Sequence, residues 1–390
     1  MIAESRLRNA VQVVTIEYVP GTLPLSRFLN QWFKKNRQMG SKDRKILSSL
    51  LYDHFRCVQM LHSLEPADQL LAARFLLNSS DAVLLPDLKP EWLPLMAQSF
   101  EEKLALLGQW YPGFTPSPLF PFAEALSKEV DQLAYTASYL KQPHLFIRSR
   151  TAYDEEIAAC LTKHEVPFVQ VSTNCFQLDN QTRVDFLNEE CPGLTEVQDL
   201  SSQLCGTYFT PAEESSWWDC CAGAGGKTLL LADIEPNVRI YASDYRETVL
   251  ENLRERLLHA GQRARKVFQT DLLHGTNLPS QDLEFDGIIL DAPCSGSGTW
   301  ARTPEMLTSF EATAVERFHE MQFTIANQVI PFLKKGAPLI YITCSVFARE
   351  NEDLVSRLVE TGQVSLEKQE YFLGYEKGAD SMFISRLIRN

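Results

Sequence analysis

The chain has 390 residues, of which 45% are hydrophobic and 22% are charged, and its formal net charge is −13. This length and composition are typical of a globular protein with two or three domains. They exclude a membrane protein, because no apolar run approaches the roughly 18 residues that cross a bilayer, and the acidity argues against general affinity for nucleic acid.

The N-terminal region is predicted to be helical over residues 1–120, because apolar residues recur at helical spacing in three segments between residues 28 and 77. It begins without the continuous apolar stretch of a signal peptide, so we expect a cytoplasmic protein. Its first 45 residues contain nine Lys and Arg against three Asp and Glu. Such a basic patch fits docking on structured RNA, and a solvated helical face is the alternative.

Four prolines between residues 112 and 121 break the helical pattern, and residues 121–144 are interpreted as a linker. Residues 145–205 predict a small α+β domain, in which short strands accompany a helix at 154–164. Residues 206–390 alternate strands and helices, which is typical of a doubly wound, Rossmann-like α/β sheet. The expected architecture is therefore an α/β domain preceded by a small α+β domain and an N-terminal helical domain.

Six strands are predicted in the last domain, at residues 216–221, 238–243, 266–269, 285–290, 338–343 and 381–387, the last of them antiparallel. Helices are expected to begin at residue 227 and to span 248–260 and 312–333. Ligands bind at the carboxyl ends of the strands in such sheets, so residues that follow the strands are the candidate site.

A glycine-rich turn, Gly223-Ala-Gly-Gly-Lys-Thr228, follows the first of these strands. It is not a nucleotide phosphate loop, because that motif requires a glycine five positions before Gly226, and Cys221 stands there. The turn lets the backbone approach a ligand, or it is a tight structural turn. Asp244 ends the second strand, where a carboxylate would bind the ribose of a nucleoside cofactor, and Asp271 ends the third, near its base. For each aspartate alone, a helix cap or a turn is the alternative.

Two cysteines follow the fourth and fifth strands, in Asp291-Ala-Pro-Cys294 and Thr343-Cys-Ser345. Methylation of a pyrimidine at C5 needs a nucleophile, because thiolate addition at C6 makes C5 able to attack a sulfonium methyl group. An acid near ring N3 promotes the addition, and a base then removes the C5 proton. Asp291, Cys294 and Cys344 supply suitable groups, although these residues alone do not rank the two thiols. Packing of two small cysteines in a core is the alternative.

The other cysteines and the histidines indicate no further chemistry. Nine cysteines, an odd number in a long chain, argue against a disulfide framework. No Cys-x-x-Cys occurs and the histidines are scattered, so we expect no metal site. Lys227 is a candidate contact to a cofactor carboxylate or to a target base, and a solvated lysine in a first helical turn is the alternative.

Together, these motifs resemble the Sun-type (Fmu-like) bacterial RNA cytosine-C5 methyltransferases: Asp219-Cys-Cys-Ala-Gly-Ala-Gly-Gly-Lys-Thr228, Ser243-Asp244, Asp291-Ala-Pro-Cys294 and Thr343-Cys-Ser345. The segment 196–203 resembles the one that precedes the cofactor domain of that family, so the resemblance covers about residues 145–390. Residues 36–44 resemble part of the NusB-like RNA-binding domain of its ribosomal-RNA members. The family loop usually has Ala and Pro where this chain has Gly223 and Ala224, which gives a more flexible loop.

The resemblance implies S-adenosyl-L-methionine as the cofactor. The residues that would hold it are Cys221, Ala222, Gly223, Ala224, Gly225, Gly226, Lys227, Asp244, Asp271 and Asp291. The resemblance also implies that Cys344 is the nucleophile and that Cys294 helps to release the methylated product, with Asp291 completing the catalytic set.

The resulting hypothesis is an S-adenosylmethionine-dependent RNA cytosine-C5 methyltransferase. It would act on ribosomal RNA with a 16S-like target, as a monomer, and without a metal or a membrane. Transfer RNA as the substrate is one alternative. A non-catalytic ribosome assembly factor that binds the cofactor is another, which the intact cysteines disfavour. A nicotinamide dehydrogenase is disfavoured because Gly-x-Gly-x-x-Gly is incomplete.

Overall fold

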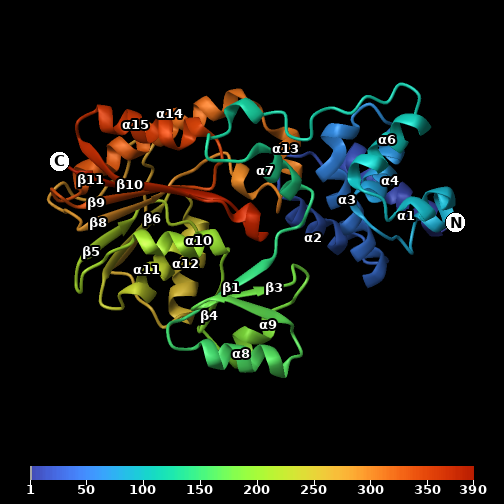
Figure 1. The fold of residues 1–390 in the computed structure, drawn as a ribbon. Helices are drawn as coiled ribbons and strands as arrows, with labels where there is room; N and C mark the ends of the chain where they lie inside the picture. The colour runs from blue at the N-terminus through green and yellow to red at the C-terminus, as the bar shows by residue number, and fades with distance from the viewer. Residues whose placement is uncertain (1) are drawn as a thin grey trace. The chain divides into compact units, whose positions relative to one another are not determined.

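The computed structural model describes residues 2–390, which form two compact units (Figure 1). The first unit consists of the chain up to Ala123 together with residues 136–141 and 300–311. The second consists of residues 124–135, 142–299 and 312–390. No helix among residues 2–390 is both long and apolar enough to span a membrane. The domain boundaries at residues 120, 144 and 205 stay predictions.

The first unit is helical, as predicted. Its helices are α1 (Ile2–Gln12), α2 (Leu25–Lys35), α3 (Ser41–Leu61), α4 (Pro66–Leu77), α5 (Leu85–Leu88), α6 (Phe100–Trp110) and α13 (Glu305–Ser309), with the short turns η1 (Val13–Glu17), η2 (Pro90–Leu95) and η3 (Ala123–Ala125) at its edge. Helix α6 begins at a capping box, in which Ser99 and Glu102 each bond the other's backbone N–H. Helix α7 (Gln132–Tyr139) contributes residues to both units.

The segment 300–311 belongs to the helical unit although it lies far along the chain. Buried Glu305 accepts a hydrogen bond from the backbone N–H of Leu25 at 2.9 Å. The Trp300 ring packs against Phe120 and Phe310, with ring centroids 6.2 and 4.9 Å apart. These contacts are long-range, so no local periodicity in the sequence reveals them.

The second unit contains a four-stranded antiparallel sheet with the order β2-β3-β1-β4. The strands are β1 (Leu145–Ser149), β2 (Phe168–Ser172), β3 (Cys175–Leu178) and β4 (Thr195–Val197), and the helices are α8 (Asp154–Lys163) and α9 (Asp185–Glu190). Ile147 and Phe176 of the sheet pack against Ile157 and Leu161 of α8, and all four are buried. This small α+β layer encloses its own core.

The second unit also contains a seven-stranded sheet with the order β10-β11-β9-β8-β5-β6-β7. Its strands are β5 (Ser216–Asp219), β6 (Arg239–Asp244), β7 (Lys266–Gln269), β8 (Gly287–Asp291), β9 (Pro338–Thr343), β10 (Val364–Phe372) and β11 (Met382–Arg389). Strands β5 to β9 pair in parallel, whereas β11 is antiparallel to both β9 and β10. The strand order reverses direction between β5 and β8, and ligands bind at such a switch point.

Helices cover both faces of the seven-stranded sheet. Figure 1 shows α10, α11 and α12 on one face and α14 and α15 on the other. Their bounds, with those of the short turns, are α10 (Leu200–Leu204), η4 (Cys205–Tyr208), α11 (Gly226–Ile234), α12 (Glu247–His259), η5 (Ser297–Thr299), α14 (Thr313–Val329), η6 (Ile330–Phe332), η7 (Ala348–Glu350), α15 (Glu352–Glu360) and η8 (Gly374–Lys377). The doubly wound α/β prediction is confirmed, including the late antiparallel strand, which is β11. Strand β10 was not predicted.

Candidate functional site

The glycine-rich turn connects β5 to α11 in a tight, left-handed path. Gly223 and Gly225 have φ values of +52° and +93°, which residues with a Cβ rarely adopt. A Cβ on Gly225 would also lie 2.2 Å from Cδ1 of Leu253 in α12. The Gly225 N–H closes the turn by bonding the Ala222 carbonyl at 2.8 Å. Glycine at position 225 therefore serves both backbone conformation and packing.

Asp244 holds this turn from the end of β6. Its carboxylate accepts the Gly223 backbone N–H at 3.0 Å and is 5% exposed. The Arg246 guanidinium lies on the same carboxylate, at 3.0 Å from Oδ1 and 3.2 Å from Oδ2. The turn and this strand-end aspartate, each predicted as part of a cofactor site, are thus in direct contact.

A cavity of about 510 Å³ opens at the carboxyl ends of the strands, and four of the predicted residues line it: Cys221, Asp244, Asp271 and Asp291. The further lining residues are Cys220, Tyr245, Arg246, Thr270, Leu272, Leu273, His274, Pro293, Phe318, Met321 and Ile325. Among the described residues, Ala222 to Lys227 are not part of this lining. Asp271 bonds its own turn and the His274 ring, at 2.8 Å.

Phe318, Met321 and Ile325 give the cavity an apolar wall that the sequence analysis missed. They recur at three- and four-residue spacing on α14. This spacing is the signal that could have found them, but it is identical to that of residues buried in a core. The apolar wall faces a cavity that also holds the carboxylates of Asp244 and Asp271. A nucleoside needs that combination, with apolar surface for its base and acceptors for its hydroxyls.

The two predicted cysteines lie side by side. The Sγ atoms of Cys294 and Cys344 are 3.4 Å apart, at the ends of the adjacent parallel strands β8 and β9. The Cys344 side chain, burial and the Glu350 carboxylate together hold the pKa of the Cys294 thiol well above its usual range. Cys294 is therefore protonated at neutral pH and is able to donate a hydrogen bond to its neighbour.

A buried carboxylate, Glu350 of η7, ties the two cysteine loops together. Its Oε2 accepts the backbone N–H of Ser295 at 2.9 Å, and its Oε1 accepts the Ser345 hydroxyl at 2.7 Å. Gln322 of α14 donates a third bond, at 2.9 Å. Each of these serines directly follows a cysteine, so Glu350 holds the two thiols in register. Nothing in the sequence around Glu350 predicted that it connects the two cysteine loops.

Lys227 and Asp291 form an ion pair beside the cysteines. Lys227 Nζ lies 3.3 Å from Asp291 Oδ2 and donates to the Ser202 hydroxyl at 2.7 Å. The lysine is 4% exposed. Burial alone would lower the pKa of Lys227, but the attraction of Asp291 outweighs it and raises the pKa. Lys227 is thus a fixed cation against the catalytic candidate Asp291, not the solvated lysine of the alternative interpretation.

Asp219, at the end of β5, was not among the predicted site residues. It is fully buried, and its Oδ2 accepts the Thr228 hydroxyl at 2.6 Å. Its Oδ1 has no hydrogen-bond partner among the described residues. Burial raises the pKa of Asp219 to about 7. The sequence analysis placed it inside the predicted strand 216–221 and at the start of the family motif, without a role in the site.

Residues 206–387 match the model of the family described as 16S rRNA methyltransferase RsmB/F. A curated relative, ribosomal RNA small subunit methyltransferase B of Salmonella newport (strain SL254), is 32% identical over 225 residues, which are 55% of this chain and 51% of that protein. The protein of the same name from Salmonella heidelberg (strain SL476) matches to the same extent. The chain spans about half the length of these curated relatives.

Solved structures share the fold. The crystal structure of PH0851 superposes with a TM-score of 0.69 at 18% identity, covering 100% of this chain and 97% of that one. NSun6 from Pyrococcus horikoshii, solved with SFG, gives a TM-score of 0.56 at 17% identity over 68% of this chain and 99% of that one. At these identities the likeness concerns the fold alone.

Proposed function

The chain belongs, through residues 206–387, to the Sun-type RsmB/F methyltransferase family, and we propose that it is an S-adenosylmethionine-dependent RNA cytosine-C5 methyltransferase acting on ribosomal RNA. The observation that carries the proposal is the pair of thiols 3.4 Å apart, beside a cavity lined by three strand-end aspartates.

The cavity fits the proposed cofactor. Asp244 would accept the ribose hydroxyls, and Phe318 and Met321 would contact the adenine, with Asp271 at its edge. The buried Lys227, which pairs with Asp291, would also attract the carboxylate of the methionine moiety. When bound, the cofactor supplies an electrophilic methyl group on a sulfonium.

In the proposed reaction, the Cys344 thiolate adds to C6 of a cytosine that has left its stack, forming an S–C6 bond. Asp291 donates or holds a proton at ring N3 and so favours the addition. C5 then takes the methyl group. Loss of the C5 proton to a base and cleavage of the S–C6 bond restore the ring and release Cys344 as a thiolate. The Cys294 thiol, 3.4 Å away, would assist this release by donating a hydrogen bond to the departing Cys344 sulfur.

RNA is the proposed partner, and a basic surface of the helical unit supports this. Lys34, Arg37 and Arg44 line a surface cavity of about 440 Å³ together with Asn30 and Phe33. The Arg44 guanidinium lies 5.6 Å from the centre of the Phe33 ring. Cations that hold phosphates beside an aromatic ring that stacks on a base are typical of RNA binding.

The test is transfer of labelled methyl from S-adenosylmethionine to RNA that lacks the modification. Wild type, Cys344→Ala and Cys294→Ala are compared, and the modified nucleoside is identified by mass. We expect 5-methylcytosine with wild type, none with Cys344→Ala, and an accumulating RNA–protein adduct with Cys294→Ala. Normal turnover by Cys344→Ala would overturn the mechanism.

Substrate class is tested in the same assay. Purified ribosomal RNA, small-subunit assembly intermediates and transfer RNA are offered in parallel. Preference for transfer RNA would replace the proposed substrate. Binding of cofactor and RNA with no transfer to any of the three would favour the assembly-factor alternative.

A further inference from the structure

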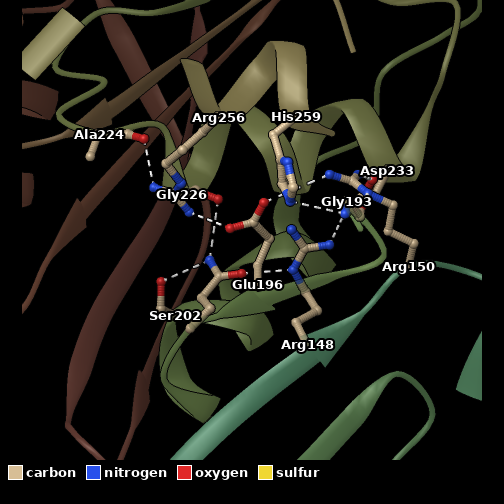
Figure 2. A network of polar contacts seen from close by, with 11 residues as sticks. Arg148, Arg150, Gly193, Glu196, Ser202, Ala224, Gly226, Asp233, Arg256 and His259 are labelled. Atoms are coloured by element: carbon tan, nitrogen blue, oxygen red, sulfur yellow. Dashed lines mark hydrogen bonds and ion pairs between the residues drawn. The ribbon is translucent and has the colours of Figure 1, made fainter. Parts of the chain in front are cut away.

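A network of charged residues, partly exposed at Arg256, connects the small α+β sheet to the glycine turn (Figure 2). We call it the arginine network, and its members are Arg148 and Arg150 of the segment that begins with β1, Glu196 of β4, Asp233 of α11 and Arg256 of α12. Both Arg148 and Arg150 pair with Asp233, and Arg150 also lies 3.8 Å from Glu196. All of these residues belong to the second unit.

Arg256 is the member that touches the glycine turn. Its Nη1 donates to the Ala224 carbonyl at 2.6 Å, and its Nη2 donates to Glu196 Oε2 at 2.6 Å. In Figure 2 the guanidinium lies between the turn and β4, with one edge toward each. A planar guanidinium is suited to such a bridge, because its donors point in fixed directions.

A second bridge runs parallel to the first. Gln198 accepts a bond from Arg148 Nε at 2.7 Å, and its amide nitrogen donates to the Gly226 carbonyl at 3.3 Å. The same nitrogen lies 3.1 Å from the Ser202 hydroxyl, which receives Lys227. Arg256 of α12, which is paired with Glu196 of β4, and Gln198, which directly follows β4, therefore hold two carbonyls of the turn, one on each side of Gly225.

The Gly225–Ala222 bond and the Asp244 carboxylate restrain part of the turn, and Arg256 adds a hydrogen bond to the Ala224 carbonyl. Gly223 and Gly225 have the freest backbones available, and both are in the left-handed region. The hydrogen bond from Arg256 fixes the direction of the Ala224 carbonyl, and therefore the orientation of the adjoining peptide planes. Those planes carry the backbone groups that a cofactor would meet.

We propose that Arg256, fixed by Glu196, is a positioning residue for the cofactor site, so that the small α+β domain forms part of the S-adenosylmethionine binding apparatus. This inference rests on the proposed function, since it takes the glycine turn as the cofactor turn. The α+β domain then has a second task beside any contact with RNA. It sets how well the turn receives the cofactor.

The test measures the Kd of S-adenosylhomocysteine for the full chain without RNA, by calorimetry. Arg256→Ala should raise the Kd about tenfold, the scale of one lost charge-assisted hydrogen bond. Arg256→Lys should recover part of this loss, because an ammonium reaches one of the two acceptors. Arg254→Ala is the matched control, since Arg254 lies on the same helix and pairs at 2.7 Å with Glu247, outside the network.

Glu196→Gln keeps the size of the side chain and tests the link if Arg256→Ala does not fold. It should weaken binding several-fold. The double variant of Glu196→Gln with Arg256→Ala should bind no worse than Arg256→Ala alone, because both changes break one path. In turnover, the KM for S-adenosylmethionine should rise while kcat at saturation stays within about twofold.

A folded Arg256→Ala protein that binds S-adenosylhomocysteine as wild type does would overturn the inference, whatever its melting temperature. A purely structural role would lower the melting temperature and leave the affinity of the folded protein unchanged. Failure of wild type to bind the compound at all would instead overturn the proposed function, and this inference with it.

Discussion

At the scale of single residues, Asp219 links the site to the stability of the fold. Its carboxyl group is fully buried, and burial raises its pKa from 3.8 to about 7. The folded protein thus favours the protonated acid more strongly than the unfolded chain does. This preference stabilises the folded protein in full below pH 3.8, and the stabilisation is lost progressively as the pH rises to 7.

We therefore expect Asp219→Asn to stabilise the protein increasingly as the pH rises. The amide keeps an acceptor for the Thr228 hydroxyl but cannot ionise. The variant's melting temperature should exceed that of wild type more at pH 8 than at pH 5, with no further change above pH 8. Thermal unfolding at several pH values measures this. An identical difference at both pH values would show that Asp219 does not titrate in this range.

Single residues also mark the limit of what the sequence predicted. The strand-end aspartates and the two cysteines were predicted because each stands next to a recognisable strand or turn. Glu350 and Arg256 were not, because their partners lie on other elements, and such contacts exist only after folding. Phe318 and Met321 were missed for another reason, since a cavity wall and a core produce the same helical spacing.

At the scale of elements, alanine substitutions at two glycines of the turn separate the effect of backbone strain from that of packing. A Cβ on Gly223 meets nothing within 4 Å, whereas one on Gly225 would collide with Leu253. Gly223→Ala should lower the free energy of unfolding by about 1 kcal/mol, from its positive φ alone. Gly225→Ala should lower it by several kcal/mol, because overpacking adds to the strain.

Urea unfolding of the two variants measures this difference. Gly225→Ala should cost less when it is added to Leu253→Ala than when it is added to wild type, because the collision is absent there. Equal losses at positions 223 and 225 would contradict the packing argument.

Among the strands, β10 shows why element prediction was incomplete. Residues 365–370 of this edge strand are all exposed, so it lacks the alternating apolar pattern by which strands are recognised. Its pairing with β11 over eight register positions defines it instead. The parallel strands β5, β6, β8 and β9 were predicted because most of their residues are buried and apolar.

At the scale of the whole molecule, a chain with a net charge of −13 is proposed to bind RNA, which is itself a polyanion. Such binding requires a local surface of positive charge. The basic surface around Lys34 and Arg37 offers a local solution. Reversing both charges, Lys34→Glu with Arg37→Glu, should weaken binding to 16S ribosomal RNA. The slope of log binding constant against log salt concentration should also become less steep by about two, one for each lost phosphate contact.

Filter binding across a series of salt concentrations provides the measurement. Lys335→Glu is the control, because Lys335 is exposed and lies in the other unit. An unchanged salt slope in the double reversal would exclude this surface from the RNA interface.

Segment 300–311 has a consequence for how the protein is made. The helical unit includes this segment, through the bond of Glu305 to Leu25 and the packing of Trp300 on Phe120. A ribosome that has synthesised residue 123 must add some 180 more before that segment emerges. At roughly 5–20 residues per second this takes on the order of ten to forty seconds. During that interval the N-terminal helices leave the ribosome with part of their core uncovered, so they are exposed to chaperones and proteases while the rest of the chain is translated.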